Sequence, residues 1–443
     1  MTSAEIIGLI GIVIALIAFT LCALRGLHTY ITCAVAVAIV VLFNRLDVTE
    51  AFTVSYWPSF LAYLQGYWWI FVGGALFGAV MNVTGASLVV GRFIMKKFSK
   101  NATLAATVLF TILQFCGISV FGGAVFAVLP MLYTIYREQD IPRRFAPAVI
   151  CFSALTLACV TPGATAAHNL IPTTYFGLPL TAGAVVGFAC LIAMLLVGQF
   201  FLDRCIAKAK RNGEHWETRP GDFPEAKEGE EEHYPPLWKI VIAMAAFPLC
   251  VNLPFMAVMH LFFRQLIATA VAMVVLFGYW DMNKLIDGWG TFVPQSLTIM
   301  FGQCAVMGFG GVFTATAAYS HVVGLLQSIP GTPLISCAVS TTLMSCVTGS
   351  ATSGINITLE SMGPIWLAQA GSAVPAAAFS RVCGLSSLVF DSMPYNGAIN
   401  GLTTGMGCKM KDAYIPIFWV TVVTPGIGTV LMIILFSIFP FLP

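Results

Sequence analysis

The chain has 443 residues, of which 58% are apolar and only 9% are Asp, Glu, Lys or Arg, with a formal net charge of +2. Soluble globular domains carry about 25% charged residues. This composition excludes a soluble enzyme, a nucleic-acid-binding protein and a disordered chain, and it predicts an all-α polytopic membrane protein. The charges are also clustered, because 15 of the 40 charged residues fall between Asp203 and Glu232.

Eight segments are apolar enough to be spanning helices, which need about 20 apolar residues each. They lie near residues 5–24, 28–44, 66–97, 181–203, 237–259, 262–280, 292–326 and 413–441. The first segment has no basic residue before it and no small-residue cleavage pattern. We therefore expect it to be a spanning helix and not a removed signal peptide.

Four further segments are interrupted by polar or helix-breaking residues. The interruptions lie at Gly117–Gly123 within residues 102–136, at Thr161–Gly163 within 143–180, at Gly349–Gly354 within 333–370, and at Asp391–Pro394 within 375–412. Irregular backbone at membrane depth is tolerated only where it is buried in protein or lines a cavity. We therefore expect the four breaks to meet at a binding site.

The order of these segments repeats along the chain. A constant offset of 232 residues aligns the Trp57-x-x-Phe60 entry with Trp289-x-x-Phe292. The same offset aligns three of the breaks' own residues, Gly117 with Gly349, Gly122 with Gly354, and Pro162 with Pro394. Identity elsewhere is low, so the prediction depends on the breaks falling in register. We predict two repeats, residues 1–203 and 237–443, joined by a cytosolic linker, residues 204–236.

The distribution of Lys and Arg predicts the topology, because cytoplasmic loops are enriched in basic residues. If residues 102–136 and 333–370 are re-entrant hairpins, each repeat crosses the membrane five times and the two repeats are inverted. With both termini outside, 18 of the 21 basic residues lie inside, Arg45 and Arg264 lie outside, and Arg381 lies in the membrane. We predict a multi-pass protein of the cell inner (plasma) membrane. Helices within 5–97 and 237–326 form a scaffold, and residues 102–203 and 333–441 form a mobile domain.

Inverted repeats that each hold a hairpin and a broken helix are typical of secondary transporters. The N-termini of half-helices suit an anion, because they present free N–H groups and a positive dipole end. The hydroxyl and amide side chains at the breaks add donors without a fixed cation. The predicted substrate-binding residues are Ser119, Thr161, Asn169, Ser350, Thr352, Ser353, Asn356 and Asn396. Glycines in membrane helices more often mark close packing, which is our interpretation of Gly73, Gly74 and Gly78.

Ionisable residues inside membrane segments are functional candidates by default. Asp391, His168 and Glu360 are the predicted proton-coupling residues. A proton on Asp391 would remove the repulsion between its carboxylate and an anionic substrate, and His168 in the opposite break could relay it. Two alternatives stay open: Asp391 caps a half-helix after Pro394, and His168 is a satisfied buried histidine. Arg381 either extends its charge to the membrane surface or attracts the substrate.

The residues at two of the breaks resemble a known family. Residues Thr161–Pro172 resemble the Pro-Gly … Asn-x-Ile-Pro segment of the gluconate permease (GntP) family, and Ser387–Gly397 resembles its Leu-Asp-x-Leu-Pro-His-Asn-Gly segment. Ile141–Arg144 also matches a counterpart there, while Tyr395 stands where the family usually has His. The overall layout, from about residue 60 to 425, is similar to that of the ion transporter superfamily.

That resemblance implies proton-coupled uptake of a sugar acid such as gluconate, or of another hydroxy- or carboxylic acid. It also implies a homodimer in which an elevator-type transport domain moves against the scaffold. We expect no metal site, no disulfide and no cofactor beyond the coupling ion, because the thirteen cysteines include no CxxC pair.

Four alternatives remain. The coupling ion can be Na⁺ in a carboxylate symporter, or Asp391 can exchange ions in a cation/proton antiporter. A channel would not need inverted hairpins. An intramembrane enzyme would need a nucleophile–base constellation, and neither GxSxG nor HExxH occurs in the sequence. The expected partners are therefore a small organic anion, the lipid bilayer and a second copy of the chain, with no nucleic acid.

Overall fold

The computed structural model is helical throughout the residues that it describes. These are residues 3–25, 27, 29–97, 101–116, 132–133, 135–218, 234–256, 258–319, 321, 324, 331–348, 350–371, 374–393, 396, 399, 402–403 and 406–440. The first predicted hairpin tip, including Ser119, lies outside them, as does most of the linker. Pro394, Tyr395 and Gly397 in the second broken helix also lie outside the described residues.

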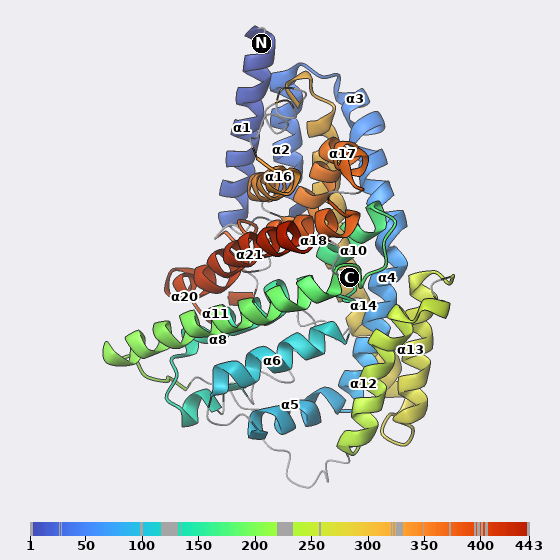
Figure 1. Ribbon diagram of the computed structural model, residues 1–443, viewed down its shortest axis with the longest axis vertical. Helices are drawn as coiled ribbons and strands as arrows, with labels where there is room; N and C mark the ends of the chain where they lie inside the picture. Colours follow the sequence, from blue (N-terminus) through green and yellow to red (C-terminus); the bar gives the residue numbers. More distant parts are fainter. Residues whose placement is uncertain are drawn as a thin grey trace.

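One group of helices runs close to the long axis of the molecule (Figure 1). Its members are α1 (Ser3–Leu24), α2 (Thr29–Asn44), α4 (Trp57–Val83), α12 (Leu237–Asn252), α13 (Leu261–Val275) and α14 (Met282–Thr314). Three short segments accompany them: α3 (Val48–Glu50), the π-helical η1 (Ala51–Tyr56) and the 3₁₀ turn η4 (Pro254–Met256). Within this group α4 packs most extensively on α14, α1 on α2, and α12 on α13.

A second group holds the segments that the sequence predicts to be broken, together with the unbroken segments near 181–203 and 413–441. It also holds residues 86–97, which the sequence analysis assigns to the scaffold. From the first half it contains α5 (Ala86–Lys97), α6 (Ala102–Phe115), η2 (Arg143–Phe145), α8 (Ala146–Ile150), η3 (Cys151–Leu157), α9 (Ala158–Val160), α10 (Ala167–Tyr175) and α11 (Ala184–Arg211). From the second half it contains α16 (Pro333–Thr348), α17 (Ala351–Gln369), α18 (Ala376–Ser386), α20 (Met410–Phe418), η5 (Trp419–Val423) and α21 (Thr424–Ile438). Several of these helices, α5, α6, α11 and α21 among them, cross the long axis obliquely (Figure 1).

The helices are long and apolar enough for a membrane protein with several spans. Within the described part of the chain, five helical segments could each cross a bilayer. They are Val48–Val83, Arg143–Val160, Ala184–Arg211, Met282–Thr314 and Met410–Ile438. The same part of the chain holds six shorter apolar helices.

Two predicted helix boundaries are wrong. The helix predicted over 66–97 is two helices, because the chain turns at Thr84 and Gly85, where Gly85 has φ of +69°. The helix predicted to end at residue 203 continues to Arg211, eight residues into the predicted linker. Lys, Arg and Ala are good helix formers, so a helix can continue past the point where its hydropathy falls.

The two long helices of the first group approach closely through small residues. A Cβ at Gly308 of α14 would lie 2.6 Å from the Tyr56 ring, and Gly311 leaves no room for a Cβ beside Ser59. Two hydrogen bonds cross the same contact: Trp289 Nε1 donates to the Leu76 carbonyl at 3.3 Å, and Ser296 Oγ donates to the Phe71 carbonyl at 3.1 Å. Gly73 likewise packs directly against Gln265 of α13, as the packing interpretation of this glycine predicts.

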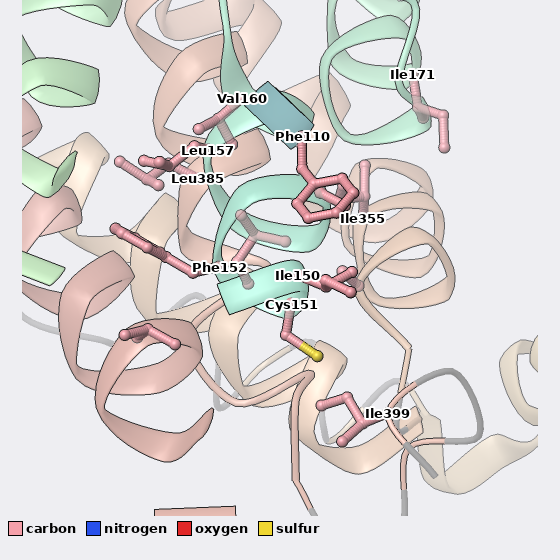
Figure 2. Packing of buried hydrophobic residues seen from close by; sticks show 14 of the residues in the cluster. Phe110, Ile150, Cys151, Phe152, Leu157, Val160, Ile171, Ile355, Leu385 and Ile399 are labelled. Carbon is pink, nitrogen blue, oxygen red and sulfur yellow. The ribbon is translucent and has the colours of Figure 1, made fainter. Parts of the chain in front are cut away.

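A buried apolar core lies where the two halves of the chain meet. Figure 2 shows Ile150, Cys151, Phe152 and Leu157 of the first half beside Ile355, Leu385 and Ile399 of the second. Most of these side chains are less than 3% exposed. The segments that carry the predicted site are therefore fixed by packing between the halves.

Candidate functional site

The second hairpin closes through a short turn that brings several hydroxyl groups together. Ser350 is the N-cap of α17, with extended backbone (φ −152°, ψ 120°), and its Oγ accepts from the Ser353 N–H at 3.5 Å. The same oxygen lies 3.1 Å from Thr352 Oγ1 and accepts from Ser353 Oγ at 3.2 Å. An N-cap serine leaves the other N–H groups of the first turn available to a ligand.

The predicted break at this tip is longer than the observed one. Helix α17 already begins at Ala351, so Thr352, Ser353 and Gly354 lie in its first turn. Gly354 is needed for packing, because a Cβ there would collide with the backbone of Ser345 on α16. The hydroxyls at the tip are therefore held on a helix end that packs tightly against its partner helix.

Asp391 connects the second break to this hairpin tip. Its carboxylate accepts from the backbone N–H of Ala351, the first residue of α17. The Oδ1 atom also accepts from Asn396 Nδ2 at 3.0 Å and from Ser392 Oγ at 3.3 Å. Helix α18 ends at Ser386, so Asp391 lies in the turns after the helix. The structure thus brings together the predicted residues Ser350, Thr352, Ser353, Asp391 and Asn396, and the half-helix expected after Pro394 lies outside the described residues. We refer to these five residues as the Asp391 cluster.

The first half of the chain covers this cluster with its π-helical segment. The thiols of Cys151 and Cys159 lie within electrostatic reach of the Asp391 carboxylate. In Figure 2 the Cys151 side chain points towards Ile399, which follows the second break. π-Helical segments inside α-helices occur frequently at functional sites. The first-half segment η3 thus forms an apolar wall beside the cluster.

Asn169 and Arg381 form a second cluster, in which the two halves are joined by hydrogen bonds. Arg381 Nη1 donates to Asn169 Oδ1 at 2.5 Å, Nε donates to the Ala182 carbonyl at 2.5 Å, and Nη2 donates to the Leu180 carbonyl at 2.7 Å. The Asn169 amide group donates to the carbonyls of Ala164 and Leu180, at 2.7 and 3.2 Å. Both ends of the Asn169 side chain are thus occupied by protein groups, which favours a structural role over direct substrate binding.

Arg381 is only 4% exposed, so the expectation that its charge extends to the membrane surface is wrong. A neighbouring cavity of about 10 Å³ is lined by Arg381, Asn169, His168, Ser380, Val160 and Met432, with Gly384 and Leu385. His168 Nδ1 is buried there and has no hydrogen-bond partner among the described residues. The alternative that His168 is a fully satisfied buried histidine therefore fails for this atom. We refer to Arg381, Asn169 and His168 as the Arg381 cluster.

The other predicted site residues lie apart from both clusters or bond within their own helix. Thr161 Oγ1 donates to the Leu157 carbonyl at 2.8 Å, and Asn356 Nδ2 donates to the Thr352 carbonyl at 2.8 Å. Glu360 is exposed on α17 and lies near Tyr319, and no contact joins it to Asp391 or Arg381 among the described residues. The same part of the chain holds no group of three His, Cys, Asp or Glu that could bind a metal.

Two features near the site were not predicted. Asn252 at the end of α12 donates through Nδ2 to the Gly163 carbonyl at 3.0 Å, so a helix of the first group touches the first break directly. The only signal in the sequence was a single amide in an apolar helix. Gly163 has φ of +87°, and a Cβ there would lie 3.2 Å from Asn252. The carbonyls of Leu180 and Ala182 accept hydrogen bonds from Arg381. These two acceptors could not be predicted, because every residue has a backbone carbonyl.

The second unpredicted feature is a polar cluster at the beginning of the linker, outside the membrane. Arg144 donates through Nε and Nη2 to the two carboxylate oxygens of Glu214, at 2.6 and 2.9 Å, and Glu214 belongs to the predicted linker. Asp140 accepts from the Trp216 backbone N–H at 2.9 Å and lies 2.6 Å from His215 Nδ1. The Trp216 N–H, and next the His215 ring, lower the pKa of Asp140 below its ordinary value. The first residues of the linker therefore pack against the turn that precedes η2.

The comparisons with known proteins agree with a transporter. No family model matches the chain. The chain is 27% identical to the Uncharacterized transporter YxjC of Bacillus subtilis (strain 168) over 456 residues, which covers 94% of this chain and 96% of that protein. The similarity extends over nearly the full length of both proteins, and the apolar helices indicate a multi-pass membrane protein. The resemblance to the gluconate permease family stays a prediction.

Proposed function

We propose that the chain is a secondary active transporter that takes up a small organic anion together with a proton. The observation that carries this proposal is the Asp391 cluster, in which one buried carboxylate from the second break contacts the N-terminus of α17. An ionised Asp391 occupies the N–H group that an anionic substrate would otherwise use. Once protonated, the side chain no longer repels the substrate, so the proton and the anion bind together.

The donors around Asp391 favour a hydroxylated acid as the substrate class. Ser350, Thr352 and Ser353 supply hydroxyls, and Asn396 supplies an amide. Hydroxyl and amide groups bind both the carboxylate and the hydroxyls of a sugar acid such as gluconate or another hydroxy- or carboxylic acid. None of them carries a permanent positive charge, so the site can release its ligand.

The helix boundaries support two repeats. A shift of 232 residues moves α2 from 29–44 to 261–276, where α13 spans 261–275. The same shift moves α6 from 102–115 to 334–347, where α16 spans 333–348. These matches involve one helix from each of the two groups, so they support repeats that each contribute to both a scaffold and a mobile domain. The inverted orientation follows from the predicted re-entrant hairpins.

The contacts between the groups support an elevator-type movement of the second group against the first. Asn252 touches the first break through one hydrogen bond, and Ile357 of α17 packs against Gly310 of α14. Helix α17 also packs along α14 beyond this pair, and α5 packs against α4 and α12. The moving part would therefore be the second group without α5, and it would slide along α14. The scaffold would form the interface of a homodimer. Both termini would lie outside, because the basic residues around Arg144 mark the cytosolic side.

In this mechanism Asp391 carries the coupled proton, and His168 relays it from the first break. Glu360 is the weaker coupling candidate, since it is exposed and distant from the Asp391 cluster. The sodium-coupled alternative assigns the same hydroxyls to Na⁺. A comparison of the gradients that drive uptake distinguishes the two.

The test uses the full chain in proteoliposomes with a panel of labelled acids that includes gluconate. An inward proton gradient at constant Na⁺ is expected to drive accumulation above the equilibrium level, and an inward Na⁺ gradient at constant pH is not. Empty liposomes and a protonophore are the controls. Accumulation that follows only the Na⁺ gradient would establish the sodium symporter, and cation exchange without movement of any acid would establish the antiporter.

A further inference from the structure

The charge of Arg381 is not balanced by any acidic side chain. Six of the 19 acidic residues lie outside the described part of the chain, and all six fall in the polar linker between residues 219 and 233. The other thirteen are described, and none of them contacts Arg381, whose three hydrogen-bond acceptors are all neutral oxygens. An arginine is always charged in a protein, and a buried charge without a partner is costly.

The cavity beside Arg381 has the donors that a counter-ion would need. The guanidinium has five N–H groups, of which three are used, so two have no partner among the described residues. His168 Nδ1 lines the same cavity without a partner. Nδ1 carries a proton in one of the two neutral tautomers and in the charged form. The Ser380 side chain is a third group on the wall.

The size of the cavity limits its occupant to a water molecule or a monatomic ion. Its volume is about 10 Å³, and a cavity needs roughly 10–15 Å³ on this measure to hold one water. An organic acid does not fit. Val160 and Met432 line the cavity with apolar surface, which makes an uncompensated positive charge more costly there. Charge therefore favours an anion over water.

We propose that the cavity is a halide site, in which one chloride ion between α10 and α18 accepts hydrogen bonds from Arg381 and His168 and neutralises the guanidinium. The ion is a structural partner of the two broken helices and not the transported substrate. It joins the first half to the second at the point where Asn169 and Arg381 already meet. This inference shares His168 with the proposed proton relay, but its test measures folding stability and requires neither the organic anion nor transport.

The experiment measures the thermal unfolding midpoint of the purified full chain in detergent. Chloride or bromide is titrated against methanesulfonate, a monovalent anion too large for the cavity, at constant ionic strength and pH. A saturable rise is expected, and at ten times the dissociation constant linkage predicts about 1.5 °C for a chain of this length. Crystals grown with bromide are expected to show an anomalous peak between Arg381 and His168.

Three variants assign the effect to this cavity. Arg381→Met is expected to abolish the halide dependence, and His168→Phe to weaken the apparent halide affinity about tenfold, the value of one hydrogen bond to a charged group. Arg264→Met, which changes an arginine that bonds the carbonyls of Met259 and Val251 away from the cavity, should keep the dependence. If Arg381→Met does not fold, the titrations of the wild type and of His168→Phe still show whether the halide binds in this cavity.

A wild-type midpoint that does not depend on the halide would overturn the proposal and assign the cavity to water. Retention of the full dependence in His168→Phe or Arg381→Met would overturn it as well, since the halide would then bind elsewhere. Methanesulfonate binding at the Asp391 cluster would shift the thermal midpoints of all variants equally. Comparison of the halide dependence between variants therefore cancels this contribution.

Discussion

The Arg381 cluster and the Asp391 cluster both lie where the two halves of the chain meet, but they satisfy their polar groups differently. Arg381 and Asn169 use backbone carbonyls of ordered loops, so each bond is fixed by the fold. Asp391 accepts one backbone N–H, from Ala351, but the other bonds of this cluster join side-chain hydroxyls, an amide and the carboxylate to one another. The first arrangement holds two segments together, whereas the second can exchange its internal bonds for bonds to a ligand.

The kind of hydrogen-bond partner separates the predicted residues that have a structural role from those that can bind a ligand. Asn169 was expected to bind substrate, yet both ends of its amide are occupied by protein groups. Ser350 and Thr352 bond mainly to each other around one N-cap, and such bonds cost little to replace. The predictions below test this division from the largest expected effect to the smallest.

The largest effect is expected from Asp391→Asn. The amide cannot take up a proton, so uptake driven by a proton gradient should fall to the equilibrium level while exchange of substrate across the membrane survives. Both are measured in proteoliposomes, with Asp287→Asn on the exposed face of α14 as the matched control. Concentrative uptake by the Asn variant would show that the proton binds elsewhere, and His168 would then be the next residue to test.

Arg381→Met should destabilise the fold without acting on the Asp391 cluster directly. It leaves Asn169 Oδ1 and the Ala182 carbonyl without the Arg381 donor, and an unsatisfied buried acceptor costs about 1–3 kcal/mol. The Leu180 carbonyl still accepts from the Gly163 N–H and from Asn169 Nδ2. The expected loss of unfolding free energy is therefore about 2 kcal/mol or more, read as a lower thermal midpoint. Arg264→Met is the control, because Arg264 is more exposed and should cost less. Equal losses of stability in the two variants would contradict the conclusion that the hydrogen bonds of Arg381 hold the two halves together.

Thr352→Ala should weaken substrate binding about tenfold, since it removes one donor to a carboxylate worth roughly 1.5 kcal/mol. Thr358→Ala on the same helix is the matched control. Its hydroxyl donates to the Gly354 carbonyl of α17 at 2.6 Å and is buried within the protein. Apparent affinities come from concentration series of uptake, with protein amounts compared on blots. The same affinity in both variants would place the substrate away from the hairpin tip.

The smallest effect concerns the cytosolic contact of Asp140. Hydrogen bonds lower its pKa in the folded protein below the ordinary value of 3.8. Its stabilising effect is therefore fully present above that value and is lost as the pH falls through the lowered pKa. Fluorine NMR of 5-fluorotryptophan should show the Trp216 signal move under strongly acidic conditions, and Asp140→Asn should show the moved signal at neutral pH. An unchanged signal in the Asn variant would show that Trp216 is held by other contacts.

The helical class, most helix positions and the break at Thr161–Gly163 were predicted from the sequence. Apolar runs mark the helices, and glycine or proline marks the positions where a helix is interrupted. The sequence also predicted that Ser350, Thr352 and Asp391 belong to one site. The partner of Asp391 could not be predicted, since the Ala351 N–H belongs to the backbone of a distant segment. Arg381 was predicted to lie in the membrane, but its acceptors could not be predicted, because the carbonyls of Leu180 and Ala182 depend on how the loop before α11 folds.

Helix α11 has a consequence for how this chain can diverge. A Cβ at Gly198 would lie 2.2 Å from the Phe152 ring, and one at Gly187 would lie 2.6 Å from Pro162. Each glycine thus leaves the space that one bulky residue of the first broken segment occupies, Phe152 beside Gly198 and Pro162 beside Gly187. Neither partner can change size alone without a clash or a void. Among relatives, positions 198 and 152 are expected to covary, as are positions 187 and 162, so a substitution that is harmful alone becomes neutral when its partner has already changed.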